Sequence, residues 1–203
     1  MKNSYPKTLV ALIHADREDC LFRTLESIHA LEYPRFSVLV ADCGSSDGLQ
    51  ETLKNRFPGL TCLRKKSNTG IASARNFCMD YYLPLDFEFI FLLDNDIELD
   101  KFCLLRLADA MQADPSMGMA APLILNEDGS ALSSGGIYFR ALGQPALMKN
   151  SDRATADIDF ATGAIGLYRK KALQAAGPFD ADFDPYGFED IDYGLRLKKQ
   201  GFL

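Results

Sequence analysis

Two aspartates one residue apart, Asp94 and Asp96, have the clearest chemical potential in this sequence. They flank Asn95 directly after a run of apolar residues, and the alternating spacing lets both carboxylates face one point, as a hard divalent cation requires. A calcium EF-hand loop starting at Asp94 is excluded, because its sixth and twelfth positions would be Leu99 and Leu105, where glycine and glutamate are needed. The pair therefore predicts an incompletely ligated Mg²⁺ or Mn²⁺, whose remaining oxygen ligands come from the phosphates of a substrate.

A second group of acidic residues lies between residues 180 and 192. It comprises Asp180, Asp182, Asp184, Glu189, Asp190 and Asp192. An acidic cluster taken alone usually marks a solvated surface, and a cation site is the alternative. For Asp192, a structural role as an acid near a helix start, where the helix dipole favours negative charge, competes with a role in a site.

Small residues are spaced along residues 68–76, at the start of a predicted helix. For Ala72 and Ala74 the simplest interpretation is close packing of the helix on a sheet. Gly70 and Arg75 suggest more, because the free N–H groups of a helix start favour anions and an arginine one turn later adds a charge-assisted contact. The segment is therefore a candidate binding site for an anionic ligand.

Several other functions are excluded or unsupported. The 203 residues contain neither a Gly-x-x-x-x-Gly-Lys-Ser/Thr loop nor a Gly-x-Gly-x-x-Gly segment, which leaves a P-loop ATPase and a dinucleotide oxidoreductase without support. The net charge of −6 argues against binding to a nucleic acid polymer. With only His14 and His29, a multi-histidine metal site is excluded, and Cys43 as a nucleophile with His14 as its base is a minor alternative.

The elements that must position these residues follow from alternating apolar runs and amphipathic segments. The expected order is strand 8–13, a helix with Leu21, Leu25 and Ile28 on one face, strand 36–41, helix 48–56, strand 60–64, a helix from about 70 to 82, and strand 87–93. Ser45, Ser46 and Asp47 are expected to provide the N-cap of helix 48–56. Repeated strand–helix alternation predicts an α/β fold, with a mainly parallel sheet and helices on both faces.

The second half of the chain has a less regular pattern. The expected order is a helix near 100–112, a strand near 117–125, an irregular hairpin over 126–143, a strand over 158–168 and a final helix over 188–200. We predict a single domain over residues 1–203, with a nucleotide-binding half to about residue 97 and an acceptor and donor-sugar half from about residue 98.

Three of the predicted strands end in polar or acidic residues, at His14, Asp42 and Asp94. In an open α/β sheet, ligands bind beyond the carboxyl ends of the parallel strands. A single acid at a strand end is commonly a helix cap, but three such ends on one edge predict one cleft.

Together these segments resemble glycosyltransferase family 2, whose members have the GT-A fold. The resemblance runs in family order from about residue 8 to the end of the chain. The matching segments are Val40 to Gly48 (family Val-Val-Asp-Asn-Gly-Ser-x-Asp-Gly), Asn68 to Asn76 (Asn-x-Gly-x-x-x-Ala-Arg-Asn), Asp94 to Asp96 (Asp-x-Asp), Gly163 to Lys170 with Gly177 to Asp180 (a donor-side Gly and Gly-x-Phe-Asp), and Glu189 to Arg196 (Glu-Asp-x-Asp-Leu-x-x-Arg).

The resemblance implies a nucleotide and metal site. Asp42 would recognise the nucleotide base, and Arg75, after Gly70, would lie beside the base or the diphosphate. Asp94 would face the ribose and the metal-bound nucleotide, and Asp96 would ligate Mg²⁺ or Mn²⁺ directly. The implied donor is a nucleotide-sugar, with a UDP- or dTDP-sugar expected first.

The resemblance also implies the groups that carry out transfer. Asp190 would be the general base, with Glu189 beside it helping to place the acceptor or the base, and the Gly163 region would pass close to the donor sugar. One base and one metal suffice for a single displacement, so the expected activity is an inverting glycosyltransferase acting on a saccharide or lipid-linked acceptor. The expected setting is synthesis of a surface polysaccharide or glycolipid.

The sequence departs from the family at three places, one of them Leu49, where the family often has Thr. The first strand ends in His14, Ala15 and Asp16, where the family usually has Thr-Tyr-Asn. Family members usually continue past the last helix with a segment whose histidine helps to bind the metal or the diphosphate, whereas this sequence ends at Leu203. We therefore expect poor turnover by the 203 residues alone.

Two alternatives stay open: a non-catalytic module that binds a nucleotide-sugar, and a sugar nucleotidyltransferase. The latter predicts a Gly-rich, Lys/Arg-bearing loop directly after the first strand, which residues 14–17 do not provide. Five dispersed cysteines suit reduced thiols, and no stretch approaches the roughly 20 apolar residues of a membrane-spanning helix. The expected location is the cytoplasm, with any contact to the inner face of the membrane made through partners or further residues.

Overall fold

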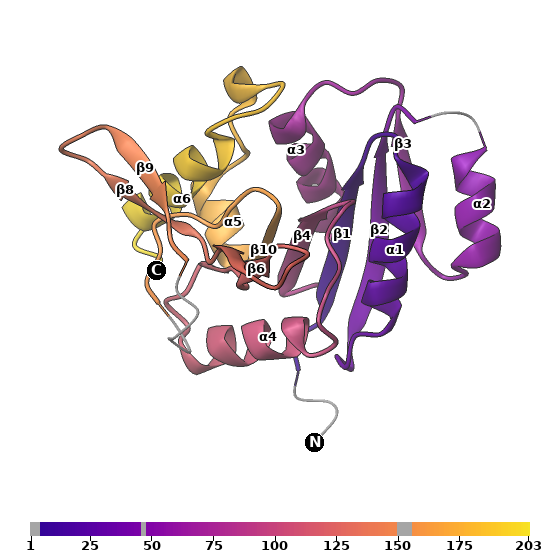
Figure 1. The fold of residues 1–203 in the computed structure, drawn as a ribbon, viewed down its shortest axis with the longest axis horizontal. Coiled ribbons are helices and arrows are strands. Elements are labelled where there is room, and N and C mark those ends of the chain that lie inside the picture. Colours follow the sequence, from indigo (N-terminus) through magenta and orange to yellow (C-terminus); the bar gives the residue numbers. More distant parts are fainter. Residues whose placement is uncertain (1–4, 46–47, 150–155) are drawn as a thin grey trace.

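The computed structural model describes residues 5–45, 48–149 and 156–203, and a mixed sheet runs through its centre (Figure 1). In these residues the sheet has six strands in the order β3-β2-β1-β4-β10-β5, with β3, β2, β1 and β4 parallel and β10 antiparallel to both of its neighbours. The strands are β1 (Thr8–His14), β2 (Phe36–Cys43), β3 (Thr61–Lys65), β4 (Phe89–Asp94), β5 (Met119–Ala120) and β10 (Ile165–Arg169). The predicted mainly parallel sheet is confirmed.

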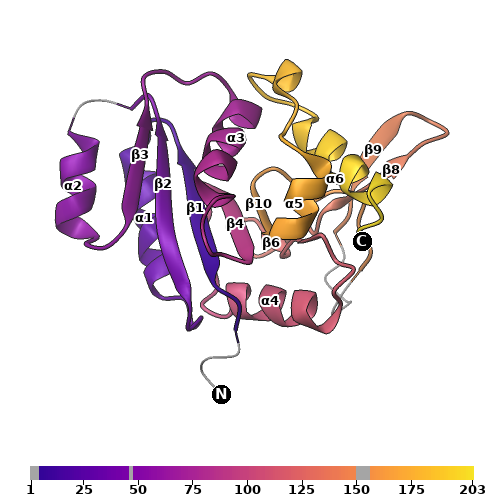
Figure 2. The same cartoon turned by 180° about the vertical axis from the view of Figure 1, so that it is seen from behind.

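Helices cover both faces of this sheet, as predicted. On one face the core is completed by α3 (Ile71–Tyr82), α5 (Lys170–Ala176) and α6 (Glu189–Lys199). On the other it is completed by α1 (Glu18–His29), α2 (Leu49–Arg56) and α4 (Cys103–Ala113). Helix α1 lies in front of the sheet in Figure 1 and behind it in the reverse view of Figure 2.

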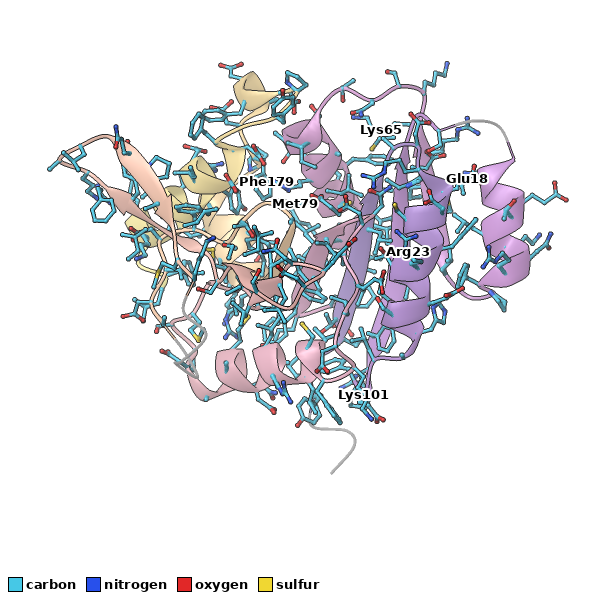
Figure 3. The ribbon with its side chains drawn as sticks, in the orientation of Figure 1. Glu18, Arg23, Lys65, Met79, Lys101 and Phe179 are labelled. Atoms are coloured by element: carbon cyan, nitrogen blue, oxygen red, sulfur yellow. The ribbon has the colours of Figure 1, made fainter. Side chains whose placement is uncertain are left out.

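The two core layers explain why the central strands are apolar throughout. In β1 all seven residues are buried, with Leu9 and Ala11 facing one layer and Val10 and Leu12 the other, because successive side chains of a strand point to opposite faces. Met79 of α3 and Phe179, both labelled in Figure 3, belong to the first of these layers.

The strand register brings the polar strand ends together. His14 of β1 pairs with Asp42 of β2, and Ile13 pairs with Asp94 of β4. These parallel strands therefore finish level with one another, and the side chains that follow them must share one edge of the sheet. The predicted common edge is confirmed.

The second half of the chain differs from the prediction in several elements. The expected strand 117–125 is divided between β5 in the sheet and β6 (Ile124–Leu125), which pairs with β7 (Ala131–Ser133). The expected irregular hairpin over 126–143 continues to the end of β9. In it β8 (Gly136–Phe139) pairs with β9 (Gln144–Leu147), and this pair of strands projects from the body of the molecule (Figures 1 and 2). The expected strand 158–168 begins only at Ile165 as β10. Helix α5 and a 3₁₀ turn at Ala181–Phe183 were not predicted.

The predicted N-cap of α2 is wrong at Ser45. The N-cap residue is Gly48, which has a left-handed φ of 104° and whose helix start receives no side-chain hydrogen bond. The hydroxyl of Ser45 instead accepts a hydrogen bond from the backbone N–H of Asp16, at 3.2 Å. Ser46 and Asp47, the other predicted caps, lie outside the described residues.

The sheet takes strands from both predicted halves of the chain, since β5 and β10 follow residue 97. The assignment of nucleotide binding to the first half stays a prediction. Within the described ranges, every helix is too short or too polar to cross a membrane.

Candidate active site

A cavity of about 430 Å³ opens at the carboxyl edge of the parallel strands. Its walls come from the ends of β1, β2 and β4, from the start of α3 and from the segment before α6. Asp94, Asn95 and Asp96 line it on the β4 side, and Gly70 lines it on the α3 side. Three of the predicted site residues, Gly70 and the two aspartates, therefore share one pocket.

Asp94 ends the buried strand β4 and is half-buried itself. Burial raises the pKa of its carboxyl group to about 7; the carboxylates of Asp96, Glu189 and Asp190 act in the same direction, and the Arg75 guanidinium acts in the opposite one. Asp94 and Asp96 line the pocket, and the carboxylates of Glu189 and Asp190 add to the negative potential at Asp94. A divalent cation would relieve it, so the donor set fits such an ion.

Asp96 is exposed to solvent and forms an ion pair with Arg17, with 3.2 Å between Nη1 and Oδ2. Asn95, between the two acids, donates to the backbone oxygen of Asp16 at 3.1 Å and contacts Nδ1 of His14 at 2.8 Å. The loop after β4 is thereby fastened to the end of β1. In the described ranges no three His, Cys, Asp or Glu side chains form a ready metal cage, so a cation here would need oxygens from a ligand.

Asp42 is completely buried at the end of β2. Its Oδ1 accepts a hydrogen bond from the backbone N–H of Ser45 at 2.9 Å, and its Oδ2 lies 3.6 Å from Nε of Arg64. The structure places Asp42 beside the pocket edge, next to the end of β1. Recognition of a nucleotide base by this residue stays a prediction.

The alternative that pairs Cys43 with His14 as nucleophile and base receives no support. Burial raises the pKa of the Cys43 thiol, which keeps it protonated and unreactive. His14 is fully buried, burial lowers its pKa, and its Nδ1 contacts the Asn95 amide rather than sulfur. The Cys43 thiol donates to the backbone oxygen of Ala41, with 3.7 Å between the sulfur and the oxygen.

The start of α3 binds a carboxylate of the protein itself, that of Asp184. The Asp184 carboxylate accepts hydrogen bonds from the backbone N–H groups of Ala72, at 2.9 Å, and Ser73, and it also contacts the Ser73 hydroxyl. A Cβ on Gly70 would lie 2.2 Å from Oδ1 of Asp184, so only glycine fits. The free N–H groups expected at this helix start are therefore not free, which corrects the sequence-based interpretation of the segment.

Replacing Asp184 with alanine should lower the free energy of unfolding by about 1–2 kcal/mol, because α3 loses the side chain that caps its first turn. Asp184→Asn should lose less, since asparagine caps helices almost as well as aspartate. Urea unfolding followed by circular dichroism measures both. Asp182→Ala, which removes an exposed acid two residues away, is the control; equal losses for Asp182 and Asp184 would contradict the capping role.

Asp190 lies in the first turn of α6 and is partly buried. Its Oδ2 accepts a hydrogen bond from the backbone N–H of Gly163 at 2.8 Å, and its Oδ1 accepts one from the N–H of Ile191 at 2.8 Å. Burial and the neighbouring Glu189 carboxylate raise the pKa of Asp190, while the two N–H donors and Arg75 act against that shift. A carboxylate with a raised pKa is a better proton acceptor.

Arg75 and Glu189 form a buried ion pair beside Asp190. Nη1 of Arg75 donates to Oε1 of Glu189 at 2.6 Å, and Nη2 donates to the backbone oxygen of Gly163 at 2.8 Å. The second oxygen of Glu189 accepts from the N–H of Gly187 at 2.9 Å. The structure thus brings Arg75, Gly163, Glu189 and Asp190 into one network, with the Arg75 donors directed at protein atoms.

Asp192 takes part in a separate pair on the outer side of the same helix. Its Oδ2 accepts a hydrogen bond from Nε of Arg196 at 2.8 Å, one turn along α6. Both side chains are partly exposed. The pairing favours the structural interpretation of Asp192 over a role in the site.

Three features of the pocket edge are not predicted by the sequence patterns. Asp184 caps α3 across 112 positions of the chain, and Asn95 links two strand ends. Tyr186 lines the pocket although 82% of its surface is exposed. The dipeptide Asp184-Pro185, which has a cis peptide bond in the structure, marks a turn in the sequence. No local pattern indicates which helix such a turn will meet.

Comparison with known proteins places the chain in a family. The family model described as Glycosyl transferase family 2 matches residues 10–177. An N-acetylglucosaminyl-diphospho-decaprenol L-rhamnosyltransferase of Mycobacterium tuberculosis is 26% identical over 214 residues, which cover 90% of this chain and 67% of the relative. A poly-beta-1,6-N-acetyl-D-glucosamine synthase of Staphylococcus epidermidis is 26% identical over 186 residues, which cover 86% of this chain but 41% of the synthase.

Solved structures show the same fold at low sequence identity. A mannosyltransferase of Pyrobaculum calidifontis, in complex with GDP-mannose and Mn²⁺, superposes with a TM-score of 0.70 at 18% identity, covering 99% of this chain and 54% of that protein. GalNAc-T7 with UDP, GalNAc and Mn²⁺ superposes with a TM-score of 0.73 at 15% identity, covering 96% of this chain and 41% of that one. The chain thus spans about half the length of these structures. It has the GT-A fold and belongs to glycosyltransferase family 2.

Proposed function

We propose that this chain transfers a sugar, with inversion at the anomeric carbon, from a nucleotide-diphosphate donor to a hydroxyl group of an acceptor, in the presence of Mg²⁺ or Mn²⁺. The observation that carries the proposal is a pair of connected carboxylate groups. Asp94 and Asp96 line the pocket. Asp190 is connected to Asp94 through two backbone hydrogen bonds: the N–H of Gly163 donates to Asp190, and the N–H of Asp94 donates to the oxygen of Ala164 at 2.9 Å.

The two groups suit different parts of one reaction. Asp190 would accept the proton of the acceptor hydroxyl while that oxygen attacks the anomeric carbon, and the bond from that carbon to the phosphate oxygen would break with its electron pair leaving on the nucleoside diphosphate. Asp94 and Asp96 would hold the divalent cation, which when bound supplies positive charge that neutralises the leaving diphosphate. A single displacement by one oxygen nucleophile inverts the anomeric configuration.

Relatives support the class of acceptor. The mycobacterial relative is named for transfer of rhamnose to a decaprenol-linked N-acetylglucosamine, and the staphylococcal one for synthesis of a polysaccharide. We therefore propose a saccharide or lipid-linked acceptor in surface polysaccharide or glycolipid synthesis. For the donor we retain a UDP- or dTDP-sugar, with GDP tested beside them because the mannosyltransferase structure holds GDP-mannose.

Calorimetry with UDP, dTDP and GDP, each with and without Mn²⁺, tests the donor site directly. We expect at least one of the three to bind in the presence of Mn²⁺ and to bind far more weakly without it. Release of that diphosphate from its sugar donor on addition of acceptor then separates a transferase from a non-catalytic binding module. Absence of any metal-dependent binding to this chain would refute the proposal.

A further inference from the structure

A short segment, residues 162–164, connects the two carboxylate groups of the site. The N–H of Gly163 donates to Oδ2 of Asp190 at 2.8 Å, and the oxygen of the next residue, Ala164, accepts from the N–H of Asp94 at 2.9 Å. Backbone groups of two adjacent residues thus contact the acid in α6 and the acid that ends β4. The position of this segment therefore sets the position of Asp190 relative to Asp94.

The Arg75 guanidinium holds this segment in place. It donates to the oxygen of Gly163 at 2.8 Å and to Oε1 of Glu189 at 2.6 Å. Arg75 and Glu189 are 2% and 5% exposed, respectively, so neither side chain faces solvent. Glu189 directly precedes Asp190 in α6, so the ion pair holds the start of that helix, and the same guanidinium holds the residue whose N–H bonds to Asp190.

Gly163 has no room for a side chain because of this contact. A Cβ at this position would lie 2.5 Å from Nη2 of Arg75 and 3.2 Å from Oε1 of Glu189. The guanidinium also lies over the ring of Phe179, at 5.3 Å from its centroid. Arg75 is therefore enclosed by Gly163, Glu189 and Phe179.

We infer that Arg75 and Glu189 are positioning residues, which hold the backbone of Gly163 and through it Asp190, and that neither contacts the donor or the acceptor. The inference rests on the proposed role of Asp190 and replaces the donor contact that the sequence predicts for Arg75. A buried, bidentate arginine suits this task, because its planar fork of N–H donors binds a carboxylate and a carbonyl in fixed directions. Lysine donates from a single nitrogen, so it cannot make the bonds to Glu189 and to Gly163 in the same two directions.

Four variants test the inference, two of them at Arg75 (to Lys and to Met), together with a matched control. Arg75→Lys keeps the charge but not the fork, and Gly163→Ala disturbs the same contact without changing any charge. Arg169→Lys is the control, because Arg169 is also a buried arginine bonded to a backbone oxygen, that of Met117 at 3.0 Å, but it lies on β10 away from the pocket. Glu189→Gln removes the negative charge of the pair and keeps its shape.

The first measurement is hydrogen exchange of the Gly163 amide, followed by NMR. In wild type this N–H is bonded to Asp190, so its exchange should be slow. We expect Arg75→Lys and Gly163→Ala to accelerate it by about tenfold or more, and Arg169→Lys to leave it unchanged. Should Arg75→Lys fail to fold, Gly163→Ala decides the question alone. Unchanged exchange in a folded Arg75 or Gly163 variant overturns the inference.

The second measurement compares turnover with nucleotide affinity. Because a misplaced base slows the chemical step, kcat should fall by about 100-fold in Arg75→Lys, while the Kd for the nucleoside diphosphate with Mn²⁺ stays within about threefold. A Kd that rises as much as kcat falls would make Arg75 a donor contact and overturn the inference. A wild-type chain that neither turns over nor binds a nucleoside diphosphate with Mn²⁺ would instead refute the proposed function, and the exchange measurement would still decide whether Arg75 holds the backbone of Gly163.

The pH profile separates the pair from a purely structural contact. Asp190 faces the charges of Glu189, Arg75 and Asp94, with Tyr168 nearby. Glu189 raises the pKa of Asp190, so Glu189→Gln should move the acidic limb of the kcat profile to lower pH, whereas Arg75→Met should move it to higher pH. Shifts in the same direction, or none, would contradict the arrangement.

Discussion

Replacing Asp190 with asparagine should lower the rate of sugar transfer by about 10²- to 10⁴-fold, the range that general bases contribute. The asparagine side chain has the same shape, but only its oxygen accepts hydrogen bonds, so it can keep one of the two bonds from the N–H groups of Gly163 and Ile191. It cannot take a proton from the acceptor hydroxyl. Transfer or donor hydrolysis, measured as nucleoside diphosphate released, gives the rate, and calorimetry should show nucleotide affinity within a few-fold of wild type.

Asp192→Asn is the matched control for this variant. Asp192 lies two residues further along α6, and its carboxylate pairs with Arg196 on the outer side of the helix. Its replacement should leave transfer close to the wild-type rate. If Asp190→Asn weakened nucleotide binding as much as it slowed transfer, Asp190 would be a structural or metal-binding residue, and the assignment of the base would be wrong.

The pH dependence of transfer should reflect the environment of Asp190. Burial and the Glu189 carboxylate raise its pKa above the ordinary aspartate value, which is about 3.9. The base is active when deprotonated, so kcat is present above the raised pKa and is lost as pH falls through it. An acidic limb at or below the ordinary value would contradict the buried position of this carboxylate.

Replacing Asp96 with alanine should remove the metal dependence of nucleotide binding. Asp96 supplies one of two protein carboxylates at the predicted cation position. The affinity for the nucleoside diphosphate with Mn²⁺ should therefore fall by about 100-fold or more, because loss of a direct metal ligand should weaken metal binding at least as much as loss of an outer-shell partner does. Affinity without Mn²⁺ should change little. Calorimetry of wild type and variant, each with and without Mn²⁺, measures both quantities.

Glu98→Ala provides the control for Asp96. Glu98 is an exposed acid on the same loop, paired with Arg23 at 3.3 Å rather than directed at the pocket. Its loss lowers the local negative charge by the same amount as loss of Asp96. If both variants weaken Mn²⁺-dependent binding equally, the effect is general electrostatic attraction. If Asp96→Ala changes nothing, the metal site fails as a proposal.

Most of the parallel sheet could be predicted from local patterns. The strand β4 (Phe89–Asp94) is apolar until its last residue because both faces are covered, and such a strand can turn polar only at an edge. The same reasoning applies to β1 and β2, so His14, Asp42 and Asp94 were correctly placed on one edge. Strand ends are local features of the sequence, and parallel pairing makes their meeting predictable.

The start of α3 shows where local reasoning stops. Its glycine and small residues indicate a helix start that attracts negative charge, and that much is correct. The group that binds there is Asp184, whose turn is 112 positions away. The N–H groups could equally have been left for a substrate phosphate, because the helix start alone does not distinguish one oxygen anion from another.

The sequence by itself established the acids, their order along the chain, the sheet that presents Asp94 and Asp96 at its edge, and the family resemblance that singles out Asp190. The tertiary structure was needed to show that Arg75 bonds to Glu189 and Gly163 inside the protein. The physical reason is that a guanidinium binds any carboxylate or carbonyl that folding brings within reach. Local sequence defines the donors that Arg75 carries, whereas the packing of α3 and α6 around the 162–164 segment defines which acceptors they meet.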